Sequence, residues 1–212
     1  MQKYSTTDRI VMGVIALFYI VGAFQLGRPE MRAMYAGLTP LVLLFSMLFL
    51  AIYDRSTERP KLLLFALIVA LASFGVEVWG VATGYVFGGY EYGNELGTKF
   101  AETPLLIGLN WILLVYMSGA MVDALPRKPL YAIALPSALM IGYDIVMEQV
   151  APRMDMWSWE GDVIPMQNYV VWGILALLFH TIRYLMKIPI RNRMAGFLFV
   201  IQVLFFAIIL MS

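Results

Sequence analysis

The sequence has no cysteine and only one histidine, His180. Without cysteine the chain forms no disulfide, no thiolate metal site and no cysteine nucleophile. Membrane di-iron hydroxylases and desaturases need several histidine ligands, so a single histidine excludes that class of oxidase. No spacing of ligand residues matches a metal site. The sequence therefore predicts a protein with no bound metal and no cofactor.

Charge is also scarce. Asp, Glu, Lys and Arg make up 14% of the 212 residues, whereas about 25% is usual for a soluble domain. Apolar residues make up 61%, and the mean hydropathy is +0.79. This composition excludes a soluble globule, a disordered chain and a basic nucleic-acid-binding domain, and the net charge of +1 indicates no polyanionic partner. We therefore expect an integral membrane protein surrounded by the lipid bilayer.

Long apolar runs give the expected fold. A helix needs about 20 apolar residues to cross about 30 Å of hydrocarbon. The stretches that meet this requirement are 10–26, 36–53, 61–84, 104–122, 130–150, 165–184 and 195–211. Short charged links separate them, except for two longer links, 85–103 and 151–164. We predict an all-α integral membrane protein, with a single transmembrane domain over residues 1–212 that forms a bundle of about seven transmembrane helices.

Basic residues are divided unevenly between the two sides of this bundle. The N-terminus and the links after the second, fourth and sixth stretches carry eleven Lys and Arg, whereas the other links and the C-terminus carry four. By the positive-inside rule, the N-terminus is cytoplasmic and the C-terminus is outside. The first stretch follows Lys3 and Arg9 but lacks a small-x-small cleavage site, so we expect an uncleaved helix. The predicted location is the cytoplasmic membrane, with a multi-pass topology.

Three carboxylates fall within the predicted spans: Glu77 in the third, and Asp144 and Glu148 in the fifth. Each costs at least about 2.5–3.5 kcal/mol on insertion scales, so each requires a reason. All three lie in the outer half of the bundle, and Asp144 and Glu148 share one helix face because they are four residues apart. Asn110 and Asn168 open the fourth and sixth spans at a similar depth. This convergence predicts a polar site in the outer half.

Structural explanations for the same residues stay open. Glu77 lies in a stripe of small residues that could pack against another helix, with its acid hydrogen-bonded across the interface. Glu148 could be solvated near the surface, and the two asparagines could join helices. The tryptophans all fall in the outer half and could form an interfacial belt, although the inner side has none. His180 lies at the inner end of its span, far from the carboxylates, and is expected to be structural.

The sequence lacks the residues of a retinal-binding site and of a P-loop phosphate site. All five lysines lie at span ends or in links, whereas a retinal-binding seven-helix protein needs a buried lysine for its Schiff base. The glycines of residues 84–89 precede no Walker lysine and no strand–helix unit, so they indicate a turn rather than a phosphate cradle. A microbial-type rhodopsin and a P-loop protein are therefore excluded.

One long segment carries a family resemblance. Residues 74–92 read FGVEVWGVATGYVFGGYEY, and shorter matches follow in the same order at 96–97, 104–111, 144–152, 157–159 and 164–169. This pattern resembles a membrane carotenoid-biosynthesis family that contains carotenoid 1,2-hydratases of the bisanhydrobacterioruberin hydratase and γ-carotene 1'-hydratase type. The resemblance implies addition of water across the terminal C1–C2 double bond of an acyclic carotenoid end. The product is a tertiary alcohol, and the reaction involves no redox change.

The residues suit this chemistry on their own. A carboxylic acid kept protonated by apolar surroundings can protonate a trisubstituted alkene. A second carboxylate can hold water and accept its proton, while aromatic faces and negative charge stabilise the cation. We expect Asp144 or Glu77 to be the general acid, with Glu148 or the remaining carboxylate orienting water. The side chains expected to bind substrate or water are Trp79, Thr83, Tyr90, Asn110, Trp111, Asn168, Tyr169 and Trp172.

The expected partners are an apolar carotenoid, the bilayer and water, with no nucleic acid; association with other carotenoid-pathway enzymes is compatible with this interpretation. Three alternatives stay open. A carotenoid cyclase or isomerase would use the same protonation but lose a proton internally. A proton-coupled transporter would use the three carboxylates as a relay, although no inverted repeat is visible. A structural lipid-binding subunit would leave the buried acids unexplained.

Overall fold

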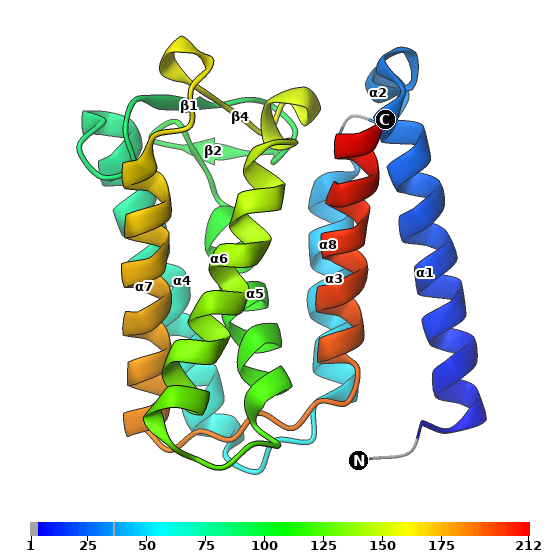
Figure 1. Ribbon diagram of the computed structural model, residues 1–212, viewed down its shortest axis with the longest axis vertical. Helices are drawn as coiled ribbons and strands as arrows, with labels where there is room; N and C mark the ends of the chain where they lie inside the picture. The colour runs from blue at the N-terminus through cyan, green and yellow to red at the C-terminus, as the bar shows by residue number, and fades with distance from the viewer. Residues whose placement is uncertain (1–3, 36) are drawn as a thin grey trace.

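The computed structural model describes residues 4–35 and 37–212, and its long helices stand side by side (Figure 1). The helices are α1 (Thr6–Gly27), α2 (Pro29–Tyr35), α3 (Thr39–Tyr53), α4 (Arg59–Thr83), α5 (Ile107–Val122), α6 (Leu135–Glu148), α7 (Met166–Leu185) and α8 (Ala195–Met211). A π-helical turn over Leu130–Ala134 leads directly into α6. Helix therefore forms over each apolar stretch identified in the sequence. Residue 36 and Lys3, which entered those predictions, lie outside the described residues.

Within residues 4–35 and 37–212, three helical segments are long and apolar enough to cross a membrane: Thr6–Gly27, Arg59–Thr83 and Leu130–Glu148. Helices α3, α5 and α8 are shorter apolar helices. These lengths and compositions fit the predicted membrane character of the chain. The number of crossings and the sidedness of the termini stay predictions.

Local sequence signals set the helix ends. Ser5 and Asp8 form a capping box at the start of α1, in which Asp8 N–H donates to Ser5 Oγ at 3.1 Å and Ser5 N–H donates to Asp8 Oδ2 at 2.8 Å. Pro60 lies in the first turn of α4, where its missing N–H costs no helical hydrogen bond. Gly84 ends α4 in the left-handed region, with φ 67°, and its N–H donates to the Gly80 carbonyl.

One predicted boundary is wrong. The span expected over 104–122 begins at Ile107, because Thr103–Pro104 forms strand β3, paired antiparallel with strand β2 (Lys99–Phe100). The Leu105 N–H donates to the Thr98 carbonyl at 2.9 Å, so this backbone is committed to a hairpin rather than a helix. The apolar residues after Pro104 concealed this small hairpin in the hydropathy pattern.

Helix α5 is the centre of the bundle. Eleven of its sixteen residues are buried, and it contacts α3, α4, α6, α7 and α8. Its crossing with α4 is close: a Cβ placed at Gly108 would lie 3.0 Å from the Ala70 carbonyl oxygen. Small residues allow helix backbones to approach in this way where hydrophobic attraction between helices is weak.

The two long links form a cap over one end of the bundle. Strand β1 (Tyr90–Tyr92) in the first link pairs antiparallel with strand β4 (Trp157–Trp159) in the second (Figure 1). Short 3-10 turns over Ala151–Met154 and Glu160–Asp162 flank β4. Side chains alternate between the faces of a strand. The aromatic residues at both ends of each strand therefore share one face.

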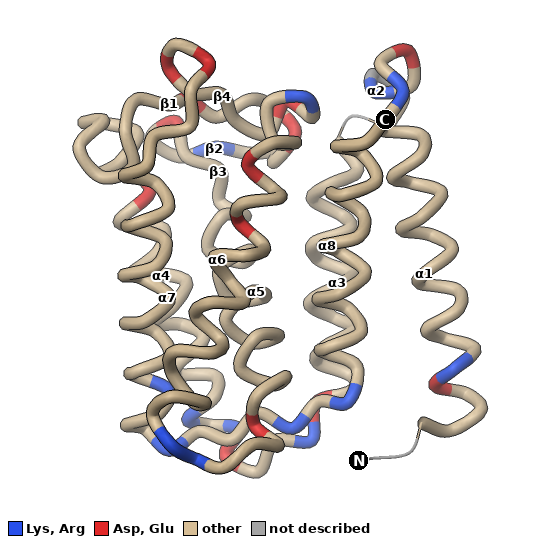
Figure 2. Tube along the Cα trace, in the orientation of Figure 1, with Lys and Arg blue, Asp and Glu red and all other residues tan. Residues whose placement is uncertain are grey.

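Charge is divided between the two ends of the bundle. Most Lys and Arg lie at the end where α1 begins, and most Asp and Glu lie at the opposite end, near the strands (Figure 2). Helix α1 begins at the basic end of the bundle, whereas helix α8 ends at the acidic end (Figure 1). The arrangement agrees with the predicted asymmetry of the links.

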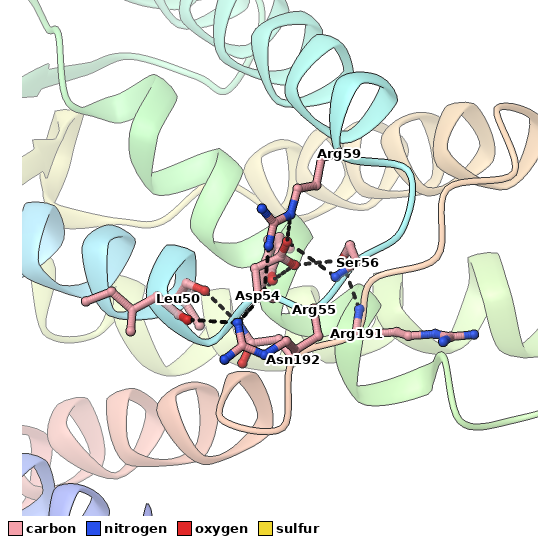
Figure 3. A network of polar contacts seen from close by, with 9 residues as sticks. Leu50, Asp54, Arg55, Ser56, Arg59, Arg191 and Asn192 are labelled. Atoms are coloured by element: carbon pink, nitrogen blue, oxygen red, sulfur yellow. Dashed lines mark hydrogen bonds and ion pairs between the residues drawn. The ribbon is translucent and has the colours of Figure 1, made fainter.

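A polar network joins the loops at the basic end (Figure 3). The Arg55 N–H donates to the Arg191 carbonyl at 2.8 Å, which ties the α3–α4 link to the α7–α8 link. The Tyr116 hydroxyl on α5 donates to Asp54 Oδ1 at 2.7 Å and accepts from Asn192 Nδ2 at 3.0 Å. The central helix is thereby fixed to both links.

We predict that Tyr116→Phe destabilises the protein without changing the cap. The substitution leaves the Asp54 carboxylate without one donor, which costs about 1–3 kcal/mol of the free energy of unfolding. Thermal unfolding of the detergent-solubilised protein should show a lower midpoint. Tyr4→Phe is the control, because the Tyr4 hydroxyl donates to the Arg193 carbonyl at an exposed position. Equal midpoints for the two variants would contradict the structural role of Tyr116.

Candidate active site

Glu77 lies on α4, 3% exposed, and is held by three neutral donors. The hydroxyls of Tyr90 and Tyr92 each donate to Oε2 at 2.7 Å, and Trp111 Nε1 donates to Oε1 at 3.1 Å. The tyrosines come from β1 and the tryptophan from α5. Both carboxyl oxygens are therefore occupied as acceptors, which compensates for the burial of this acid.

Glu148, at the end of α6, is held in a similar way from the other strand. The indole nitrogens of Trp157 and Trp159 donate to Oε2 at 3.0 and 2.8 Å. Asn168 Nδ2, on α7, donates to Oε1 at 3.0 Å. This carboxyl group is 2% exposed, and its two oxygens again accept from three donors.

Asp144 has a different environment. It is fully buried one turn before Glu148 on α6, and within the described residues its carboxyl group accepts one hydrogen bond, a long one from Asn168 Nδ2 to Oδ2 at 3.4 Å. Oδ1 has no hydrogen-bond partner among the residues that the structure describes. An unpaired buried polar atom costs about 1–3 kcal/mol or more, so such an atom requires an explanation. Asn168 bridges the two carboxyl groups of α6.

The β1–β4 pair organises the donors. Its register sets Tyr90 opposite Trp159 and Tyr92 opposite Trp157. The facing rings lie close, with centroids 5.2 Å apart for the first pair and 6.1 Å for the second. The tyrosines of β1 therefore donate to Glu77, and the tryptophans of β4 donate to Glu148. Gly80 makes room beneath β1, since a Cβ there would lie 3.1 Å from the Tyr90 hydroxyl.

The two tyrosines of β1 are fixed as donors. Burial, and then the neighbouring Glu77 carboxylate, raise the pKa of both phenols above the usual value of about 10. Tyr90 and Tyr92 therefore stay protonated at neutral pH and keep donating to Glu77.

A small cavity separates Glu77 from Glu148. Its volume is about 20 Å³, and about 10–15 Å³ is enough to hold one water molecule. The cavity has polar groups on several sides, as a bound water requires. Its lining residues are Glu77, Phe87, Tyr90, Tyr92, Ile107, Glu148, Trp157, Trp159, Asn168 and Trp172.

Aromatic rings surround the same region. Trp111 and Trp172 are stacked, with centroids 4.1 Å apart and planes at 26°. Phe179 contacts Trp111 edge-on at 5.8 Å. The faces of such rings carry negative charge density, which attracts cations. Within the described residues, no group of three or more His, Asp or Glu side chains is arranged to hold a metal ion.

The structure brings most of the predicted site residues together, but not all of them. Trp79 is 59% exposed, and Thr83 is exposed with its hydroxyl donating to the Trp79 carbonyl at 2.7 Å. Trp79 follows Glu77 by two residues, which is about 200° around a helix, so the two side chains point to different faces. Tyr169 is half-buried, and within the described residues no hydrogen bond joins it to Glu77, Asp144 or Glu148. We do not retain these three residues in the site.

Asn110 does not line the small cavity between the carboxylates. It is 8% exposed and instead lines a larger cavity next to Trp157. His180 is buried, and its Nε2 lies 3.2 Å from Ser118 Oγ. It takes no part in the carboxylate cluster.

Three residues of the cluster were not among the predicted site residues: Tyr92, Trp157 and Trp159. The signal for them is the alternation of Tyr-Glu-Tyr at 90–92 and Trp-Ser-Trp at 157–159, which places two aromatic residues on one face of a strand. The tryptophans also fit an interfacial belt, which hid their role.

The raised pKa values predict a pH dependence of stability. Above about pH 10 the tyrosines of the unfolded chain lose protons before Tyr90 and Tyr92 do, so the free energy of unfolding falls as the pH rises further. Tyr92→Phe should make this decline shallower, because it removes one of these two phenols. Unfolding midpoints from neutral pH to about pH 11 measure the effect. A decline of the same steepness in Tyr92→Phe and the wild type would contradict the assignment.

Comparison with known proteins assigns the chain to a family by its sequence. No solved structure matches the chain. Bisanhydrobacterioruberin hydratase from Haloarcula japonica is 28% identical over 201 residues, which cover 84% of this chain and 66% of that relative. The chain thus spans slightly less than two thirds of the relative's length.

The family match covers the whole site. Residues 38–212 match the family described as carotenoid biosynthesis protein, and this range includes Glu77, Asp144, Glu148 and both cap strands. The resemblance seen in the sequence is confirmed by this match. The chain belongs to the carotenoid biosynthesis protein family.

Proposed function

We propose that this protein is a hydratase that adds water across the terminal C1–C2 double bond of an acyclic carotenoid end. One observation carries the proposal: Asp144, a buried acid with an oxygen that has no partner among the described residues, lies one helical turn from Glu148, which borders a cavity of the size of one water molecule. An acid, a water site and a second carboxylate are the parts that alkene hydration requires. Membership of the carotenoid biosynthesis family supports the substrate class.

Asp144 is the proposed general acid. A carboxyl group donates its proton to an alkene only if the O–H is not already used in a strong hydrogen bond. Glu77 and Glu148 each accept from three donors, whereas Asp144 Oδ1 has no partner among the described residues. The geometry therefore favours Asp144 over Glu77, which the sequence left as equal candidates.

The proposed reaction conserves atoms and charge. The Asp144 proton forms a new C–H bond at C2, the double bond breaks, and a tertiary cation forms at C1. Water from the small cavity attacks C1 through its oxygen. Its proton passes to Glu148, so the product is a neutral tertiary alcohol. Transfer of that proton to Asp144, which shares Asn168 with Glu148, restores the starting state.

The surroundings of the site would stabilise the cation. The Glu77 carboxyl group, fixed by Tyr90, Tyr92 and Trp111, faces the water cavity from the side opposite Glu148. Stacked Trp111 and Trp172 offer aromatic faces nearby. Preorganised charge and ring faces of this kind lower the energy of a carbocation without reorganising during the reaction.

The membrane arrangement is part of the proposal. We propose that the seven helical stretches cross the cytoplasmic membrane with the N-terminus inside, so that the cap and the carboxylates lie toward the outer surface. Water then reaches the site from the cap, while the apolar substrate arrives from the bilayer.

Expression in a host that accumulates lycopene is the direct test of the activity. Mass analysis of the pigments should show products heavier by one or two molecules of water. A product of unchanged mass but altered spectrum would indicate cyclisation or isomerisation instead. An unchanged pigment profile across several acyclic carotenoids would reject the hydratase and favour a carrier.

Isosteric amides test the residue roles in the same host. Asp144→Asn and Glu148→Gln should each lower the hydration rate by about 10²–10⁴-fold, the usual contribution of a general acid or base. Glu91→Gln is the matched control, because Glu91 is exposed on the opposite face of β1. If Asp144→Asn and Glu148→Gln both hydrate at the wild-type rate, the acid–base mechanism is wrong.

A further inference from the structure

A second cavity lies beside the carboxylate cluster, between α1, α3 and α8 on one side and α5 and α6 on the other. Its volume is about 450 Å³, within the range of about 300–1,000 Å³ that is typical of ligand sites. We call it the chain cavity. The residues that line it are Val14, Leu17, Phe18, Tyr19, Val21, Gly22, Gln25, Leu26, Tyr35, Leu38, Thr39, Val42, Leu43, Leu96, Asn110, Tyr143, Met147, Met154, Met156, Trp157, Gln202, Phe205 and Phe206.

The walls of the chain cavity suit an apolar occupant. None of these lining residues is charged. Several of the polar side chains at its border bond to one another: Gln202 Nε2 donates to the Tyr19 hydroxyl at 3.1 Å, and the Tyr143 hydroxyl donates to Gln202 Oε1 at 3.4 Å. These three groups need no partner from a ligand, whereas Gln25 Oε1, also on the wall, has no hydrogen-bond partner among the described residues. The cavity therefore favours a hydrocarbon chain over a charged lipid headgroup.

The chain cavity is also open to the side. Leu17 and Phe18 line it from α1, yet they are 64% and 59% exposed. Side chains that face both a cavity and the surroundings mark an opening between helices. In a membrane this opening faces the acyl chains, from which a carotenoid would enter.

One side chain joins this cavity to the site. Trp157 lines both the chain cavity and the water-sized cavity, and among the described residues it alone does so. Its Nε1 donates to Glu148 Oε2 at 3.0 Å. The reacting end of an isoprenoid chain in the larger cavity would thus extend past the Trp157 indole to meet the proposed water.

Helix α1 forms one wall of the chain cavity but lies outside the family match. The match begins at residue 38, whereas α1 spans Thr6–Gly27. The carboxylates, the cap and Trp157 all lie inside the match. The chemistry and the α1 wall therefore belong to different parts of the chain.

From these observations we infer that the chain cavity is the subsite for the isoprenoid chain behind the reacting end, and that the α1 wall determines which chains it accepts. This inference rests on the proposed function for the identity of the chain. The new elements are the location of the subsite, its sideways opening and the role of α1 as a specificity element.

Filling the cavity from α1 tests the inference. A Cβ at Gly22 would lie 3.8 Å from Phe205 Cε2, an ordinary contact, so the rest of a leucine side chain would enter the cavity. Gly13→Leu is the matched control, because Gly13 has nothing within 4 Å of its Cβ and does not line the cavity. Val21→Phe fills the cavity without replacing a glycine.

The readout is quenching of tryptophan fluorescence by lycopene, measured with the full chain in lipid nanodiscs. We expect Gly22→Leu and Val21→Phe to raise the half-quenching lycopene concentration at least tenfold, with Gly13→Leu and the wild type equal. Asp144→Asn should bind lycopene as the wild type does, since binding does not use its proton. Equal lycopene binding by all three α1 variants, or no quenching of the wild type, would overturn the inference.

The same measurement separates this inference from the proposed function. If the wild type binds lycopene, the cavity-filling variants do not, and no water is added to any acyclic carotenoid, the chain cavity stands and the hydratase proposal fails. If hydration proceeds equally in Gly22→Leu, Val21→Phe and the wild type, the hydratase stands and the chain cavity is overturned.

Discussion

The pairing of β1 with β4 is the interaction on which the rest of the site depends. Glu77 and Glu148 are 3% and 2% exposed in a chain of membrane character, where an uncompensated acid would be costly. The two strands supply four of the six donors that compensate them. Because the strands also pair with each other, the donors of one carboxyl group are placed by those of the other. A shift of register by one residue would turn the two aromatic side chains of one strand away from those of the other.

This arrangement divides the acids by their hydrogen bonds. Two carboxyl groups are fully satisfied and therefore fixed, and the third, Asp144, is left with one long contact. A structure selected only for stability would satisfy Asp144 or replace it with an apolar residue. Keeping it unpaired costs stability, and the proposed chemistry explains why: the acid that protonates an alkene needs a free oxygen, whereas the groups that hold water need fixed ones.

The sequence was sufficient to predict the helices and the convergence of the acids, because both follow from apolar runs and from the positions of charges within them. Glu77, Asp144, Glu148 and Asn168 were expected close together and do meet. The rotational phase of a helix was harder to predict: Trp79 lies near Glu77 along α4 but on another face. The cap could not be predicted, because three-residue strands in separate links carry little local signal and their pairing is a long-range event. The hairpin at Pro104 was missed for a different reason: its strands have two residues each, and the apolar residues after Pro104 extended the hydropathy signal of the span.

The proposed hydration of a carotenoid end requires hydrocarbon and water, which do not mix, to meet at one carbon atom. Only the last atoms of the hydrocarbon would leave the bilayer, and water would reach those atoms without filling the apolar cavity. Trp157 meets both requirements of this proposal: its indole lines the apolar cavity, and its N–H donates to Glu148, which lines the water-sized cavity. An apolar side chain in its place would leave Glu148 short of a donor, and a small polar one would open the wall. An indole satisfies both conditions, which explains why a tryptophan, rather than a phenylalanine or a serine, lies at this boundary.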